Sequence, residues 1–257
     1  MVLIIGTFSF SIIEKISLTD AFYFTITTIS TVGYGDVHPT TETGKMLAIF
    51  IIVMGVGTFL GVIANAAEII LNMRERKRRL EKLNMIIGAF FSEVGTELIT
   101  YLSNFDLKID ECRNELIIDN SCSKQSFNAI RNKLKKHPQM IEIDKSKLPV
   151  LRKFLIQRRD FLLRLLENSS ILEHETFAEL LMAVFHLAEE LEHRHRLSQL
   201  PEKDLEHLSN DIKRVYVLLV YQWLDYMEHL KKNYPYLFSL AIRTNPFNKM
   251  ASPIIKE

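Results

Sequence analysis

Residues Thr27 to Asp36, TTISTVGYGD, combine three threonines and a serine with two glycines and a terminal acid. Gly33 and Gly35 are separated by a single residue, and glycine adopts backbone conformations that are closed to residues with a Cβ atom. An alternation of glycine with side-chain residues therefore lets successive carbonyl groups point the same way. Four such segments around one axis would stack rings of oxygens that replace the water around a dehydrated cation. The Thr31 hydroxyl would add a further ring, and the hypothesis requires four copies of the chain.

A second group of potential ligands lies in HLAEELEHRH, residues 186–195. At helical spacing His186, Glu190 and His193 share one face, with Glu175 and Glu179 one turn or more before them. Such side chains can bind a transition metal. However, metal sites in helix bundles project inward, whereas the apolar side chains here lie opposite, at Phe177, Leu180, Leu181, Val184, Ala188 and Leu191. The pattern therefore favours a solvated His/Glu face without a metal, and a metal-binding domain is the alternative.

A long apolar segment separates these two groups. From Met46 to Ala67 the chain has 22 residues without a charge, and about 20 are needed to cross the hydrocarbon core as a helix. The stretch that follows, NMRERKRRLEK, carries six Lys or Arg against two Glu. Positive residues mark the cytoplasmic end of a span. We therefore expect a protein of the cell membrane, with residues 14–45 outside and residues 72–257 in the cytoplasm.

Two shorter apolar segments precede this span. Leu18–Ser30 is predicted to form a short helix capped by Thr19 or Asp20. It is too short to cross a bilayer, and such a helix is tolerated at membrane depth only where protein or a water cavity surrounds it. Met1–Ile13 is also too short, and it lacks the basic start and the cleavage site of a signal peptide. We expect it to be the outer end of a first membrane helix whose beginning is missing, in a multi-pass protein.

The segment TISTVGYGD, Thr28–Asp36, resembles the selectivity-filter signature of potassium channels, T-x-x-T-V-G-Y-G-D. The pattern IIVMGVGTFLGVIANAAEII is similar to the inner helix of prokaryotic two-transmembrane potassium channels of the calcium-gated type. The resemblance covers residues 1–79. It implies a homotetramer in membrane lipid, with K⁺ ions in the filter and no organic cofactor. The filter residues that it implies are Thr31, Val32, Gly33, Tyr34 and Gly35.

The sequence departs from the family pattern at several places. The Trp pair common in pore helices is replaced by Tyr23 and Phe24. Tyr23 either supports the filter through a hydroxyl directed toward Asp36 or packs in the pore-helix interface. Ala64 stands where some relatives place an acid, so high conductance is not implied. We find neither a Rossmann-type ligand-sensing unit nor an Arg-rich voltage-sensing helix, so any sensor is expected in the C-terminal part.

Small and apolar residues of the inner helix suggest how it opens and closes. By resemblance Gly55 is a hinge, where glycine costs the helix roughly 1 kcal/mol and relaxes the backbone. Gly57 and Gly61 allow close helix packing, and we favour the hinge for Gly55 and packing for Gly61. A hydrophobic gate that closes by dewetting is expected on the face shared by residues spaced by four, namely Val56, Leu60 and Ala64.

The C-terminal part shows helical patterns and few strand patterns. The predicted fold class is therefore all-α, with a membrane pore module at 1–79 and a helical cytoplasmic domain at 80–257. Helices are predicted near 123–136, 147–167, 173–197, 202–233 and 234–247, with breaks at His137-Pro138, Asn168–Ser170 and Gln199–Glu202. One apolar seam follows a three-four spacing and forms either a bundle of four chains or an amphipathic helix packed on its own domain, with the residues Leu80, Leu83, Ile87, Phe90, Val94 and Leu98.

Composition excludes some function classes. The net charge of +1 gives no reason to expect nucleic-acid binding. Cys112 and Cys122 have no metal-ligand spacing, and no nucleophile–base pair points to an enzyme. The favoured hypothesis is a potassium-selective channel gated by its helical domain through a ligand or partner that the sequence does not identify. The alternative is a channel pore whose helical domain binds a metal or only assembles the tetramer.

Overall fold

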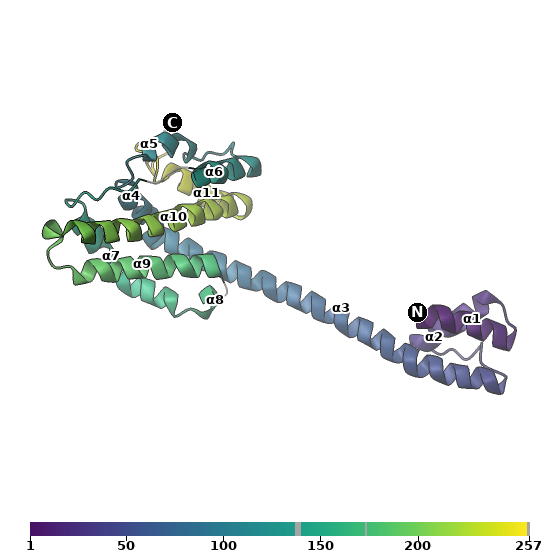
Figure 1. Ribbon diagram of the computed structural model, residues 1–257. Helices are drawn as coiled ribbons and strands as arrows, with labels where there is room; N and C mark the ends of the chain where they lie inside the picture. Colours follow the sequence, from purple (N-terminus) through teal and green to yellow (C-terminus); the bar gives the residue numbers. More distant parts are fainter. Residues whose placement is uncertain (137–139, 173, 256–257) are drawn as a thin grey trace. The chain divides into compact units, whose positions relative to one another are not determined.

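The computed structural model describes residues 1–136, 140–172 and 174–255. The chain divides into two compact units, Met1–Arg78 and Arg79–Glu257, and each is described by itself (Figure 1). Helices make up both units, and the described residues contain no strand, only one isolated antiparallel bridge between Asp106 and Ile141. The predicted all-α fold class is confirmed.

The first unit consists of α1 (Val2–Glu14), α2 (Leu18–Ile29) and the beginning of α3 (Glu42–Phe90). Its small core is centred on Phe10 and Phe24, whose rings stack with their centroids 4.0 Å apart. The cap of α2 was wrongly predicted. Ser17, and neither Thr19 nor Asp20, is the N-cap, because the Ser17 Oγ accepts a hydrogen bond from the backbone N–H of Asp20 at 3.1 Å.

Helix α3 contains the charge-free segment and continues through the basic stretch to Phe90 without a break. Among the described residues, its helical run is the one long and apolar enough to cross a membrane, by length and composition. α1, with 13 residues, is a shorter apolar helix. The apolar residues of α3 from Ile52 to Leu71 are mostly exposed in the single chain, as expected for a surface that lipid or further copies cover.

The second unit is a helical bundle built around α9 (Glu175–His193), which packs against α7 (Leu148–Leu166) and α10 (Glu202–Asn233) (Figure 1). The remaining elements are η1 (Phe91–Gly95), α4 (Thr96–Ser103), α5 (Ile109–Cys112), η2 (Arg113–Glu115), α6 (Lys124–Lys136), α8 (Ser169–Leu172), η3 (Leu197–Gln199) and α11 (Pro235–Arg243). One apolar core joins them. Its largest buried side chain, Trp223, meets the ring of Phe247 edge-on at 5.2 Å between centroids.

The predicted helix ranges agree with the structure to within two residues, except at the ends of α9 and α11, where α11 ends at Arg243 and not at residue 247. The pattern predicted a helix to residue 197, but α9 ends at His193 and Arg194 takes an extended conformation. Arg194 there forms ion pairs with Glu190 and Asp204, which explains the early stop. The breaks predicted near 168–170 and 199–202 are present, and the one at His137-Pro138 lies outside the described residues.

The apolar seam that begins near Leu80 packs on its own domain. Five of its six side chains are in the core of the second unit, at Leu83, Ile87, Phe90, Val94 and Leu98. The ring of Phe90 meets Phe177 of α9 edge-on at 5.4 Å between centroids. Only Leu80, 48% exposed, lies outside the core. The structure therefore favours the amphipathic-helix alternative over a bundle of four chains.

Candidate functional site

The segment after α2 has an alternating backbone. Thr31, Gly33 and Gly35 have positive φ angles of 62°, 52° and 80°, and Val32 and Tyr34 between them do not. The loop is held to α2 by two hydrogen bonds, in which the backbone N–H groups of Val32 and Gly33 donate to the Thr27 carbonyl at 2.9 and 3.1 Å. For the two glycines this conformation carries little steric cost, whereas for Thr31 it costs about 1–2 kcal/mol.

The alternation leaves the carbonyl groups of the segment available. Among the described residues, none of the carbonyl oxygens of residues 31–35 accepts a backbone hydrogen bond. Tyr34 is 71% and Val32 52% exposed in the single chain. A row of unpaired carbonyls on a strained backbone is chemically suited to bind a cation without its water, and the exposed side chains leave surface for other copies to cover.

Tyr23 and Asp36 lie behind this segment. The hydroxyl of Tyr23 interacts with the Asp36 carboxylate, and the ring of Tyr23 is parallel to that of Tyr34, with centroids 6.4 Å apart. The Asp36 Oδ1 also accepts a hydrogen bond from the backbone N–H of Val37 at 3.0 Å. These contacts agree with the first of the two roles considered for Tyr23.

An anchor that the sequence did not reveal holds the loop after the segment. Both carboxylate oxygens of Glu14, the last residue of α1, accept hydrogen bonds from Thr40 and Thr41. Each threonine donates its backbone N–H and its hydroxyl, at distances of 2.6–3.1 Å. The Thr40 and Thr41 hydroxyls lower the pKa of Glu14 to about 2. The available signal was a lone acid at the end of an apolar helix.

The inner-helix residues have distinct surroundings. Val56 is half-buried and Leu60 and Ala64 are exposed in the single chain, so a cavity-lining role needs further copies. Within the single chain, the space beside Gly55 and Gly61 differs from the expectation. A Cβ on Gly55 would lie 2.5 Å from Cγ1 of Ile29, whereas nothing lies within 4 Å of one on Gly61. Gly55 is therefore a packing glycine within the chain, and its role as a hinge stays a prediction.

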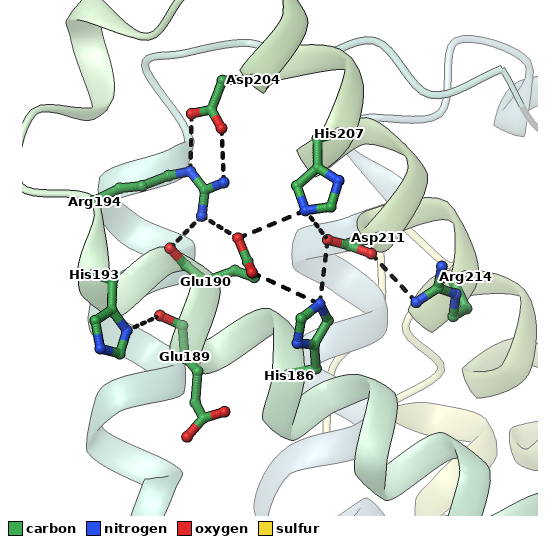
Figure 2. A network of polar contacts seen from close by, with 9 residues as sticks. All are labelled: His186, Glu189, Glu190, His193, Arg194, Asp204, His207, Asp211 and Arg214. Carbon is green, nitrogen blue, oxygen red and sulfur yellow. Dashed lines mark hydrogen bonds and ion pairs between the residues drawn. The ribbon is translucent and has the colours of Figure 1, made fainter.

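The predicted His/Glu group is only partly brought together. The Nε2 of His186 lies 3.8 Å from Oε1 of Glu190, but His193 turns away and its Nδ1 contacts the Glu189 carbonyl at 2.8 Å. His207 and Asp211 of α10 take its place beside Glu190 and His186 (Figure 2). The face is thus not simply solvated. The sequence feature that could have revealed this pairing is a repeated spacing, His-x-x-x-Glu in α9 and His-x-x-x-Asp in α10.

Charged neighbours surround this polar cluster. Arg194 contacts Glu190 and reaches Asp204 at 2.7 Å, and its hydrogen bond lowers the pKa of Glu190. Arg214 Nη1 lies 3.4 Å from Oδ1 of Asp211. Both arginines fix the carboxylates that face the two imidazoles.

The helical unit also contains a cavity of about 760 Å³. The end of α3 lines it with Asn84, Met85 and Gly88, and α10 and α11 contribute Tyr226 and Leu237. It is large enough for a small organic ligand, and a ligand there would touch α3 directly.

Comparison with known protein families finds a match for each of the two units. Residues 1–72 match the family described as ion channel, and this match points to a channel and not to an enzyme. Residues 79–243, more than half of the chain, match the family described as the C-terminal helical domain of uncharacterized protein MJ1433. The chain belongs to this MJ1433 family.

The chain covers different fractions of its relatives. Uncharacterized protein MJ1433 of Methanocaldococcus jannaschii is 48% identical over 190 residues, which are 74% of this chain and 76% of that protein. The calcium-gated potassium channel TvoK of Thermoplasma volcanium is 40% identical over 63 residues, 24% of this chain and 18% of the relative. Two-pore potassium channel 4 of Arabidopsis thaliana is 50% identical over 56 residues, 22% and 19% of the two chains. The chain thus spans about a fifth of these two channels, and no solved structure matches it.

Proposed function

We propose that this chain is one subunit of a homotetrameric potassium channel of the cell membrane. K⁺ ions pass through a filter formed by Thr31–Gly35 of four copies. The potassium channels among the relatives support this ion as the one conducted. The charge-free part of α3 spans the bilayer as the inner helix, with its basic end and the helical unit in the cytoplasm.

The observation that carries the proposal is the positive φ at Thr31, Gly33 and Gly35. A backbone that alternates in handedness turns its successive carbonyl groups to one side. Four copies then supply stacked oxygen rings for dehydrated K⁺, with the Thr31 hydroxyls as a further ring. Tyr23 supports the filter through Asp36, and no organic cofactor takes part.

The proposal that the helical domain gates the pore rests on the continuity of α3. The helix contains the apolar segment of the pore, and Leu83, Ile87 and Phe90 near its end belong to the core of the helical unit. A ligand in the cavity beside Asn84 and Met85 would shift the pore equilibrium by its difference in affinity for the open and closed states. In the alternative, the domain only assembles the tetramer or holds a metal.

Substitution of Gly33 tests the filter. An alanine at φ +52° strains the backbone whatever the free space, so Gly33→Ala should abolish K⁺ flux into vesicles while the tetramer survives on size exclusion. Gly88→Ala is the matched control, because the added carbon would make an ordinary contact, 3.7 Å from the ring of Tyr226, and the helix tolerates alanine. Unchanged flux and reversal potential in Gly33→Ala would overturn the filter assignment.

A further inference from the structure

Four side chains of the helical unit converge between α9 and α10. His186 and Glu190 are one helical turn apart on α9, and His207 and Asp211 are one turn apart on α10 (Figure 2). Both imidazoles direct Nε2 into the space between the helices, where both carboxylates also point (Figure 2). The arrangement is local to one folded unit and needs no second copy of the chain.

Four contacts form a closed ring, in which the Nε2 atom of each imidazole lies near an oxygen of each carboxylate. The Nε2 of His186 lies 3.8 Å from Oε1 of Glu190 and 3.7 Å from Oδ2 of Asp211. The Nε2 of His207 lies 3.7 Å from Oε2 of Glu190 and 3.3 Å from the same Asp211 oxygen. Ligand atoms of His186, Glu190 and His207 all lie within 4.8 Å of one another.

These separations of 3.3–3.8 Å are close to those of ligands around a metal ion. In a tetrahedral zinc site with bonds of about 2.0–2.2 Å, neighbouring ligand atoms are about 3.3–3.6 Å apart. A direct N–H···O hydrogen bond would instead bring nitrogen and oxygen to about 2.7–3.2 Å. All four contacts are longer than that, so a shared proton explains the ring poorly.

Asp211 provides an independent observation. Its side chain is 4% exposed, and its Oδ2 is buried without a hydrogen-bond partner. An unsatisfied buried carboxylate oxygen is costly. The atom faces the two Nε2 atoms, and an unprotonated Nε2 would repel it. A cation between them would satisfy all three atoms at once.

The surroundings orient the ligands and admit an ion. Arg194 and Arg214 hold the outer sides of Glu190 and Asp211, and Asp204 in turn pairs with Arg194. Three carboxylates against two guanidinium groups leave an excess of one negative charge when the imidazoles are neutral. The side chains of His186 and His207 are 45% and 53% exposed, which gives an ion a path from solvent.

We propose that His186, Glu190, His207 and Asp211 bind a divalent transition-metal ion, with Zn²⁺ as the best fit. Two imidazole nitrogens and two carboxylate oxygens are suitable zinc ligands, whereas Mg²⁺ prefers oxygen ligands in an octahedron. This site differs from the sequence-based group, because His193 is replaced by two residues of α10. It does not depend on the proposed channel function.

Zinc binding to the full chain tests the proposal. The tag-free protein in detergent is stripped with a chelator and titrated with Zn²⁺ by calorimetry, and thermal unfolding is followed by circular dichroism. We expect one Zn²⁺ per chain and a higher unfolding midpoint with zinc. His186→Gln and His207→Gln should each weaken binding at least about tenfold, the loss that even outer-shell changes cause, and should remove the zinc-dependent shift. His193→Gln, on the same helix but outside the ring, should bind like the parent.

The outcomes separate the alternatives. The double variant His186→Gln/His207→Gln keeps the buried Asp211, and its melting curve without metal shows whether it folds. A folded double variant that no longer binds zinc supports the site. Absence of stoichiometric zinc in the parent, or equal binding in the double variant, would overturn it and leave an ion-pair network. Because the readout is metal binding, failure here would leave the filter proposal standing.

Discussion

The side chain of Ile29 fills the space beside Gly55, so that a carbon added to Gly55 would lie 2.5 Å from Cγ1 of Ile29. Ile29 is the last residue of α2, two positions before Thr31. This contact places α3 directly against the end of α2, next to the proposed filter segment, within one chain. Close packing of this kind would transmit a displacement of α3 to Ile29 and through the backbone to Thr31.

Gly55→Ala should therefore perturb conduction through packing. Overpacking of this size costs about 1–3 kcal/mol, and we expect lower K⁺ flux and reduced K⁺ over Na⁺ selectivity in reversal potentials. Removal of the opposing side chain in Gly55→Ala/Ile29→Ala should restore part of the selectivity. Gly88→Ala is the control, because its added carbon would make an ordinary contact, 3.7 Å from the ring of Tyr226. A change in open probability alone, with selectivity intact, would favour the hinge role instead.

The link between Glu14 and the loop at Thr40 and Thr41 should persist in acid. Hydrogen bonds from Thr40 and then Thr41 lower the pKa of Glu14 from 4.5 to about 2. The stabilisation is therefore complete above pH 4.5 and disappears as the pH falls through about 2. Between pH 7 and pH 5 we therefore expect no decrease in the thermal unfolding midpoint of the protein from loss of this link.

Glu14→Ala should lower that midpoint at pH 7, because the backbone N–H groups of Thr40 and Thr41 lose their acceptors. Glu42→Ala is a suitable control, since Glu42 is exposed and forms an ion pair with Lys45, three residues away. Equal midpoints for the two variants would show that the anchor contributes nothing.

Leu60→Asn should raise the open probability of the channel. If four Leu60 side chains close the cavity by excluding water, an amide wets the constriction and stabilises the conducting state. Single-channel recording measures the effect, and Leu60→Ile is the control because it keeps the site apolar. Unaltered gating in Leu60→Asn would move the gate elsewhere, for example to the filter.

Two changes at the junction of the units test gating by the helical domain. One protein ends after Arg79, and the other carries a flexible Gly/Ser insertion between Arg79 and Leu80. A flexible linker transmits little force compared with a helix, so both should shift the open probability in the same direction. Normal gating with the insertion, together with failed assembly of the shortened chain, would make the domain an assembly module.

Local patterns predicted most of the helices and the unusual backbone at Gly33 and Gly35. The absence of charge from Met46 to Ala67 marks α3, and two glycines spaced by two mark the positive φ at positions 33 and 35. These features depend on neighbours along the chain, so periodicity and residue type are sufficient to find them.

Features that join distant residues were missed. Glu14 bonds to Thr40 and Thr41 across 26 and 27 positions, and no helical period connects them. Likewise, His186 meets Asp211 only because α9 and α10 pack side by side. The sequence offered His193 instead, since it lies on the same helix, and the register between two helices is set by core packing that a single helix pattern does not contain.

The burial of Leu83, Ile87, Phe90, Val94 and Leu98 within one chain has a consequence for proteolysis. Because the seam is already covered by its own domain, the second unit needs no neighbouring copy to shield its core. A protease that cuts within the basic stretch of residues 74–79 would therefore release the second unit with its core still covered. Such cleavage would separate the two halves of the protein permanently while denaturing neither.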